Sequence, residues 1–248
     1  MKLAIMQPYF FPYPGYFQLL AQADLWVVFD HCQFVNKGWV NRNRILHPDP
    51  EKGWQYLTVP LSKRGRFDFI DQIDIDENAD WRMSLVGKLT HYRAAPHYQE
   101  VMAVFKDALS YQGCRLSAFL VNSLRLLADY LGVKTRIVVY SDLDLGIGIE
   151  SVVHSGQWAL RISEALGATE YLNPMGGKSL FDPLEFLEAG IELRFLETRI
   201  REYRQGPYDY VPNLSILDAM MWCASDTLKS MLNEDFSIHS CSGAFNEC

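Results

Sequence analysis

The sequence predicts an α/β protein with a mostly parallel sheet, a nucleotide-binding-like N-terminal βαβ unit and a helical middle section. Short apolar runs typical of buried strands alternate with helical patterns near both ends of the chain. A long helical pattern lies between them, and 49% hydrophobic with 21% charged residues is an ordinary globular composition. We therefore expect one catalytic α/β domain over residues 1–235, a helical insertion around 81–131 and a loose tail at 236–248.

The N-terminal unit begins with an apolar run at residues 3–6, which Pro8 ends. A loop punctuated by proline and glycine follows, and apolar residues at helical spacing then predict a helix over residues 16–23. Residues 25–29 are apolar throughout, as in a strand buried inside a parallel sheet. Strand, helix and strand form a βαβ unit, whose crossover should be right-handed.

The rest of the chain supplies further strands and helices. The pattern of residues 116–131 predicts a helix that ends at Gly132, a residue suited to a C-cap. Further strands are expected at 54–60, 70–75, 135–140, 170–172 and 191–195, and further helices at 155–166, 183–189 and 214–223. Since ligands of open parallel sheets bind beyond the carboxyl ends of the strands, the first loop and the loop at Gly176-Gly177 should face one crevice.

Charge and composition exclude several classes of protein. A net charge of −7 argues against general nucleic-acid binding, although it leaves room for a small basic pocket. The five cysteines are odd in number and lack CxxC spacing, and the histidines are scattered, so we expect neither disulfides nor a metal site. The N-terminus shows no signal-peptide pattern, and no apolar run approaches the roughly 20 residues that span a bilayer. We expect a cytoplasmic protein that does not insert into membranes.

The loop at residues 6–16 is the main candidate for a ligand site. Aromatic residues near proline and glycine suit a pocket for a flat or sugar-like ligand, but they also suit the cover of a sheet edge. A glycine would let the backbone approach a ligand, and the following helix N-terminus would favour an anion. The residues expected to bind substrate here are Gln7, Tyr9, Tyr13, Gly15 and Tyr16.

The spacing Tyr13-x-Gly15-Tyr16 is similar to the H-x-G-H signature of nucleotidyltransferases and of AMP-forming ligases such as pantothenate synthetase. Residues 17–29 also resemble the helix and second strand of those enzymes. Both histidines of the signature are tyrosines here, which carry no positive charge near neutral pH. Charge for a transition state would have to come from Arg42, Arg44, Lys178 or a metal ion. The alternative is a tight turn on a packed sheet edge.

Two further segments could bind an anion. In the run Trp39-Val40-Asn41-Arg42-Asn43-Arg44, an extended backbone would place both asparagines on one side and both arginines on the other. Two guanidiniums on one face can hold a phosphate or carboxylate, so Trp39, Asn41, Arg42, Asn43 and Arg44 are candidate binding residues, with a solvated segment as the alternative.

The second of these segments runs from Asn173 to Ser179. Paired glycines could expose N–H groups to an anion, with Lys178 adding a mobile charge, although the spacing is not that of a Walker A loop. We expect Asn173, Gly176 and Gly177 to bind substrate and Lys178 to neutralise developing negative charge on a phosphate. The alternative is that the segment is only a structural turn.

Asp30, His31 and Cys32 follow the second strand. Neighbours on a strand point to opposite faces, so the thiol and the imidazole should not pair directly. We expect Asp30 or His31 to act as a catalytic proton acceptor, with histidine better matched to neutral pH.

Taken together, these stretches resemble the WbqC-like protein family of bacteria. The matching stretches lie at residues 6–17, 38–45, 171–177, 180–182 and 213–218, the last reading Asn-Leu-Ser-Ile-Leu-Asp. Related genes occur in clusters for O-antigen and other surface polysaccharides. By that association, the resemblance implies a role in joining an amino acid or acyl group to an amino sugar.

The sequence therefore leads to three hypotheses. The first is an amide-forming ligase that uses ATP and Mg²⁺ and passes an activated acyl group to the amine of an amino sugar or nucleotide sugar. The second is an acyl- or aminoacyltransferase with a pre-activated donor, such as a thioester or charged tRNA. The third is a non-catalytic carbohydrate-binding protein of the same pathway.

Overall fold

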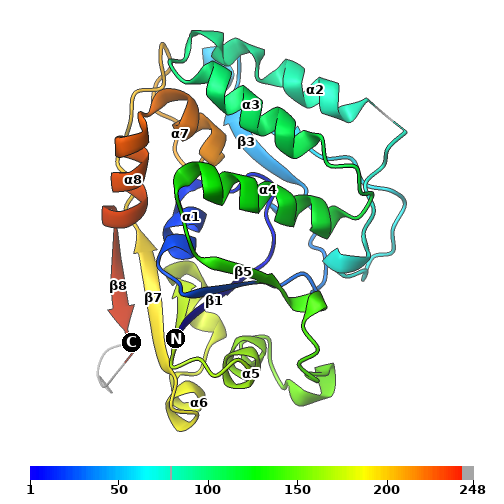
Figure 1. Cartoon of the computed structure of the whole chain (residues 1–248), viewed down its shortest axis with the longest axis vertical. Helices are drawn as coiled ribbons and strands as arrows, with labels where there is room; N and C mark the ends of the chain where they lie inside the picture. Colours follow the sequence, from blue (N-terminus) through cyan, green and yellow to red (C-terminus); the bar gives the residue numbers. More distant parts are fainter. Residues whose placement is uncertain (79, 242–248) are drawn as a thin grey trace.

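The computed structural model describes residues 1–78 and 80–241, and their main feature is a mixed sheet with strand order β5-β2-β1-β6-β7-β8 (Figure 1). All neighbouring pairs are parallel except β7 with β8. The strands are β1 (Lys2–Met6), β2 (Leu25–Val28), β5 (Arg136–Val139), β6 (Glu170–Pro174), β7 (Glu192–Thr198) and β8 (Phe236–Ser240).

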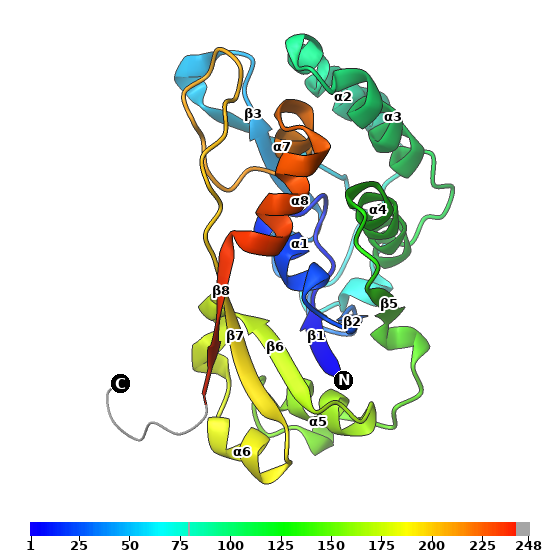
Figure 2. The same cartoon turned by 60° about the vertical axis from the view of Figure 1, so that its left-hand side comes forward.

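Both faces of this sheet are buried. Alternate residues of β1 and β2 face opposite sides, so Ala4 and Trp26 pack in one core cluster and Leu3 and Leu25 in another. The larger cluster involves α1 (Pro14–Ala21), α3 (Tyr98–Leu109), α4 (Leu116–Leu131), α7 (Ile216–Trp222) and α8 (Ser225–Glu234). The smaller one involves α5 (Gln157–Ala165) and α6 (Pro183–Glu188), on the opposite side in Figure 2. Double burial explains why every residue of β2 is apolar.

The N-terminal segment forms a βαβ unit, since β1 and β2 are parallel neighbours joined through α1, and its nucleotide-binding-like character stays a prediction. From β1 the chain proceeds to β2 and β5 on one side, whereas β6 and β7 lie on the other. The strand order therefore reverses between β1 and β6. In open α/β sheets this is the place where a crevice forms beyond the carboxyl ends of the strands.

The segment between the neighbouring strands β2 and β5 holds the predicted helical section. It contains α2 (Trp81–Lys88), α3, α4 and the 3-10 helix η3 (Thr90–Ala94), and Gly132 ends α4 with φ of 73°. Before these helices, β3 (Arg42–Leu46) and β4 (Trp54–Thr58) form a separate antiparallel pair. The strand predicted at 70–75 is wrong: Ile70–Gln72 form the 3-10 helix η2, with Ile73 N–H donating to the Ile70 carbonyl.

The C-terminal part differs from the prediction. Instead of opening a loose tail, Phe236–Ser240 form β8, whose backbone pairs with β7 and whose Phe236 and Ile238 pack on the larger core cluster. The alternation of apolar residues in this strand is the signal that predicts it. Residues 242–248 of the expected tail lie outside the described residues, within which no helix is long and apolar enough to cross a membrane.

Candidate functional site

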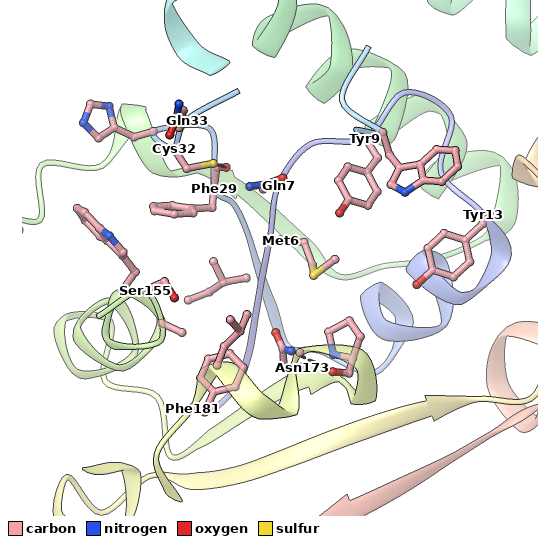
Figure 3. Close-up of a pocket in the computed structure, with 18 of the residues that line it drawn as sticks. Met6, Gln7, Tyr9, Tyr13, Phe29, Cys32, Gln33, Ser155, Asn173 and Phe181 are labelled. Carbon is pink, nitrogen blue, oxygen red and sulfur yellow. Dashed lines mark hydrogen bonds between the residues drawn. The ribbon is translucent and has the colours of Figure 1, made fainter. Parts of the chain in front are cut away.

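A cavity of about 1030 Å³ opens where the strand order reverses. Its walls include Met6 and Gln7 at the end of β1, Phe29 and His31 after β2, and Asn173 at the end of β6. In Figure 3, Met6 and Gln7 lie between Tyr9 and Tyr13 on one side and Phe29, Cys32 and Ser155 on the other. The first loop thus reaches the carboxyl edge of the sheet, as the sequence predicted.

Aromatic rings make up much of the cavity wall. They come from the first loop, the segment after β2, η2, α5 and the segment around β6, and they are Tyr9, Tyr13, Phe29, Trp39, Phe69, Trp158, Tyr171 and Phe181. Burial raises the pKa of both Tyr9 and Tyr13, so their phenols remain neutral hydrogen-bond donors near neutral pH. Rings with a polar tip suit a ligand that has flat or sugar-like faces.

His31, a residue of this wall, is hydrogen-bonded to Asp71, which does not line the cavity. His31 Nδ1 lies 2.7 Å from Asp71 Oδ2, and the imidazole packs edge-on against Phe69 with ring centroids 4.6 Å apart. An ionised carboxylate only accepts hydrogen bonds, so this contact favours the tautomer in which Nδ1 donates to Asp71 and Nε2 is the acceptor of the neutral imidazole. In many general-base sites, a carboxylate orients the catalytic histidine in this way.

Neither neighbour of His31 is hydrogen-bonded to it, because Asp30 and Cys32 have other partners. Asp30 is buried, and its two oxygens accept hydrogen bonds from Ser141 N–H at 3.1 Å and Ser141 Oγ at 2.7 Å. It lines a separate, smaller cavity of about 260 Å³ rather than the main one. Cys32 does line the main cavity, but burial raises the pKa of its thiol to about 12, so the thiolate is scarce near neutral pH.

The two arginines of β3 have different positions. Arg44 lines the cavity, lies over the rings of Trp39 and Trp54, and donates to the Asn213 carbonyl at 3.1 Å. Arg42 lies over Tyr56 and donates to the carbonyls of Lys37 and Gly38, outside the cavity wall. The expected pair of guanidiniums around one anion is therefore wrong, because Arg42 holds its own loop instead.

Asn43 lies between the two arginines of β3, and Asn41 directly precedes the strand. Asn43 is buried, and its Nδ2 donates to the carbonyls of Phe10 and Phe11 at 3.1 and 2.9 Å. It thereby holds the first loop at Phe11, whose φ of 42° is unusual for a non-glycine residue. Asn41 donates to the Val59 carbonyl and is not part of the cavity wall, whereas Asn43 is.

Two first-loop residues expected to touch substrate are buried in the fold instead. Tyr16 is 1% exposed, and its hydroxyl donates to the Gln7 carbonyl at 2.9 Å. A Cβ at Gly15 would lie 2.6 Å from Thr198 Cγ2 and 2.5 Å from the Tyr13 ring, so this glycine allows α1 to approach β7 closely. Gly15 and Tyr16 therefore position the loop, and Gln7, Tyr9 and Tyr13 face the cavity.

The glycine segment after β6 is the 3-10 helix η6 (Met175–Leu180), in which neither glycine has a positive φ. The left-handed alternation that builds an anion nest is therefore missing, which corrects that prediction. Asn173 and Gly177 line the cavity, and a Cβ at Gly177 would lie 2.3 Å from Asn173 Nδ2. Gly176 and Lys178 are exposed and lie outside the wall.

Some wall residues have no counterpart among the predictions. Asp71 itself borders the site through His31, and its segment was expected to be a strand. Others come from segments to which no role was assigned, and they are Gln33, Phe69, Ser155, Trp158, Thr198 and Asn213. Asn213 carries the one usable signal, since it opens the stretch Asn-Leu-Ser-Ile-Leu-Asp.

The stretches that carry the family resemblance meet around the cavity. Ser215 N–H donates to the Arg44 carbonyl at 2.8 Å, Ser215 Oγ to the Phe11 carbonyl at 2.7 Å, and Ile216 N–H to the Pro12 carbonyl at 2.7 Å. The stretch at 213–218 thus joins the first loop to β3. Segments some 200 residues apart in sequence build one corner of the site.

No group of three or more His, Cys, Asp or Glu within residues 1–78 and 80–241 is placed to hold a metal ion.

Comparison with known proteins finds 29% identity over 222 residues to the uncharacterized protein Rv1507c of Mycobacterium tuberculosis, covering 88% of this chain and 92% of that protein. No solved structure matches the chain. Residues 7–230 match the WbqC-like protein family, and the chain belongs to that family.

Proposed function

We propose that this protein is an enzyme that forms an amide bond between an acyl or aminoacyl group and the amine of an amino sugar in surface-polysaccharide biosynthesis. The observation that carries the proposal is His31, which lines a large aromatic cavity and whose Nδ1 lies 2.7 Å from Asp71 Oδ2. Histidine is the side chain most suited to accept a proton near neutral pH, and an oriented general base contributes about 10²–10⁴-fold to a rate.

The chemistry assigned to His31 is deprotonation of the attacking amine. The amine nitrogen bonds to the acyl carbonyl carbon, and its proton passes to His31 Nε2. The carbon–leaving-group bond then breaks with its electron pair on the leaving group, which takes the proton from the imidazole. Asp71 is a positioning residue that stabilises the transient imidazolium, as in other carboxylate–histidine pairs.

A pre-activated donor suits the cavity better than ATP with Mg²⁺. Among the described residues that form its wall, Arg44 is the one guanidinium, and neither a lysine nor a carboxylate takes part. Nucleotide triphosphate sites usually combine several positive groups with carboxylates that hold Mg²⁺. The exposed position of Lys178 removes the cation that the ligase hypothesis assigned to phosphate. A thioester donor fits the net charge of −7 better than charged tRNA does.

An ATP-dependent ligase remains the second candidate because the cavity lies at the strand-order reversal of a βαβ-containing sheet, where nucleotides commonly bind. A panel of thermal-stability measurements separates the candidates: ATP with Mg²⁺, AMP, coenzyme A, glycine and nucleotide-linked amino sugars. A ligand at 100 times its Kd stabilises by about 2.7 kcal/mol.

Each result of this panel has a consequence. Stabilisation by coenzyme A and by an amino sugar, without an effect of ATP–Mg²⁺, supports the transferase. Stabilisation by ATP–Mg²⁺ with release of AMP selects the ligase. Sugar binding without any acylated product, with every activated donor tried, sinks both and leaves a carbohydrate-binding protein.

A further inference from the structure

We infer that Arg44 forms an oxyanion-binding subsite at the Trp39 end of the cavity, so that the amine-bearing substrate also carries a phosphate or a carboxylate. The inference deepens the proposed function, because it names a chemical feature of the substrate. It does not depend on turnover, since the subsite can be tested by binding alone.

The first observation is the fixed position of the Arg44 guanidinium. Its Cζ lies 5.3 Å from the ring centroid of Trp39 and 5.1 Å from that of Trp54, and its Nη2 donates to the Asn213 carbonyl at 3.1 Å. Two indole contacts and one hydrogen bond hold the side chain in place before any ligand arrives. Little side-chain entropy then remains to be lost on binding.

The second observation is unused hydrogen-bonding capacity. A guanidinium has five N–H donors, and the Asn213 carbonyl accepts from one of its nitrogens. Arg44 Nε is buried and has no hydrogen-bond partner among the described residues. A buried unsatisfied donor is costly to the folded state. An oxyanion could accept hydrogen bonds from the remaining N–H groups of the guanidinium, whose planar geometry suits bidentate binding of a carboxylate or phosphate.

The third observation is the charge balance of the cavity. No carboxylate lies among the described residues of its wall, which is otherwise formed by aromatic rings and neutral polar groups. A lone positive charge in surroundings of low polarity attracts an anion more strongly than it would in bulk water. Asp71 is hydrogen-bonded to His31 and does not line the cavity.

The cavity size agrees with a ligand that reaches both groups. About 1030 Å³ exceeds what an amino acid or a single sugar ring fills, and it lies at the upper end of small-molecule sites. Tyr9 and Tyr13 lie on one side of Gln7 in the cavity, and Phe29 and Cys32 lie on the other (Figure 3). A sugar ring that stacks on these aromatic residues could present its amine to His31 while its anionic group lies at Arg44.

Arg42 provides a matched control. It is two residues away on the same strand, carries the same charge and also contacts an aromatic ring, with its Cζ 4.2 Å from the Tyr56 centroid. It is absent from the cavity wall. Arg42→Gln therefore removes one positive charge from the same strand without removing the subsite.

The test measures binding by titration calorimetry with glucosamine, glucosamine 1-phosphate and glucuronate as probes. Wild type should bind at least one of the two anionic sugars at least tenfold more tightly than glucosamine, and Arg44→Gln should lose that preference while Arg42→Gln keeps it. A preference for glucosamine 1-phosphate identifies phosphate as the anion, and a preference for glucuronate identifies carboxylate. Arg44→Lys should recover only part of it, because an ammonium lacks the fork.

Equal binding of charged and neutral sugars by wild type would overturn the inference, as would an equal loss in Arg42→Gln. The melting temperature of each unliganded variant shows whether it has folded. If the anion preference depends on Arg44 but no amide is formed, the subsite stands and the proposed acyl transfer fails.

Discussion

The carboxylates of Asp218 and Asp71 are both held by hydrogen bonds, but their surroundings differ. Asp218 is fully buried, and its oxygens accept from Tyr92 Oη, Tyr203 Oη and Gln205 Nε2, each at 2.7 Å. Asp71 has His31 as its side-chain partner, and its buried Oδ1 lacks a hydrogen-bond partner among the described residues. The first carboxylate ties segments together, and the second leaves an imidazole available to the cavity.

The Asp218 cluster links α7 to η3, to the end of β3 and to residues 203–211. Tyr92 lies in η3, and its hydroxyl also accepts from Leu46 N–H at 2.9 Å, at the end of β3. Gln205 in turn bonds with both the N–H and the carbonyl of Val211. The comparison teaches that a network in which every buried polar group is paired fixes the positions of the segments it joins. A carboxylate with a single side-chain partner can instead orient a group that takes part in chemistry. Substitutions at the two carboxylate sites should separate stability from activity.

The largest effect is expected for His31→Gln. Amide formation should fall by about 10²–10⁴-fold, because glutamine cannot accept the amine proton. Stability should change little, because the imidazole is partly exposed and its one ion pair is with Asp71. Steady-state rates and urea unfolding of the same preparations measure both effects. Equal rates in the variant and wild type would remove His31 from the mechanism.

The opposite pattern is expected for Asp218→Ala. Three donors would lose their acceptor in the protein interior, so the free energy of unfolding should fall by about 3–5 kcal/mol. Urea unfolding monitored by tryptophan fluorescence measures this loss. A loss below about 1 kcal/mol would contradict a structural role for the cluster.

A pH dependence of stability should also come from Asp218. Burial raises the pKa of this carboxyl from 3.8 to about 6, so between these values the folded state holds more protons than the unfolded state. Stability therefore decreases as pH rises through this window, in total by on the order of 3 kcal/mol from this group. In Asp218→Asn the decrease should be absent. Unfolding free energies measured from pH 4 to 7 in both proteins test this, and parallel profiles would contradict it.

A smaller effect is expected for Gly177→Ala. The added methyl group would displace the Asn173 side chain, whose Nδ2 donates to the Pro174 carbonyl and whose Oδ1 accepts from Tyr171. We expect a loss of about 1 kcal/mol in stability together with weaker ligand binding, because Asn173 lines the cavity. Gly176→Ala is the control, because no atom lies within 4 Å of the position of its Cβ.

The smallest effect is expected for Lys178→Ala. Lys178 is exposed in η6 and lies outside the cavity wall, so ligand binding and rate should remain within twofold of wild type. The ligase hypothesis requires a large loss instead. The thermal shift caused by ATP–Mg²⁺, where one is seen, should therefore be the same in the variant, and its disappearance would restore Lys178 to the site.

The parallel strands were predictable because burial on both faces produces continuous apolar runs such as residues 25–29. β8 was missed because its alternation is short, with apolar side chains only at Phe236 and Ile238. The position of the first loop at the carboxyl edge of the sheet was predictable, because the loop directly follows a parallel strand. Its position next to residues 213–216 depends on hydrogen bonds between distant segments, which leave no periodic pattern in the sequence.

Part of the site was predictable from local sequence patterns. Strand alternation applies within β3, where it places Asn43 opposite Arg42 and Arg44, but not to Asp30 and His31, which lie beyond the end of β2. It could not separate Arg44 from Arg42, which share a face and differ only in what surrounds them. Nor could it identify Asp71, which reaches His31 because Ile70 N–H donates to the Cys32 carbonyl and Phe69 bridges to Gln33.

The most direct test of the account is mass-spectrometric detection of an acylated amino sugar. Wild type, His31→Gln and Arg42→Gln would each be incubated with coenzyme A thioesters and with the amino sugars that stabilise the protein. We predict an amide product with wild type and Arg42→Gln at similar rates, and a rate at least 100-fold lower with His31→Gln. Product at equal rates in all three, or none with wild type, would contradict the account.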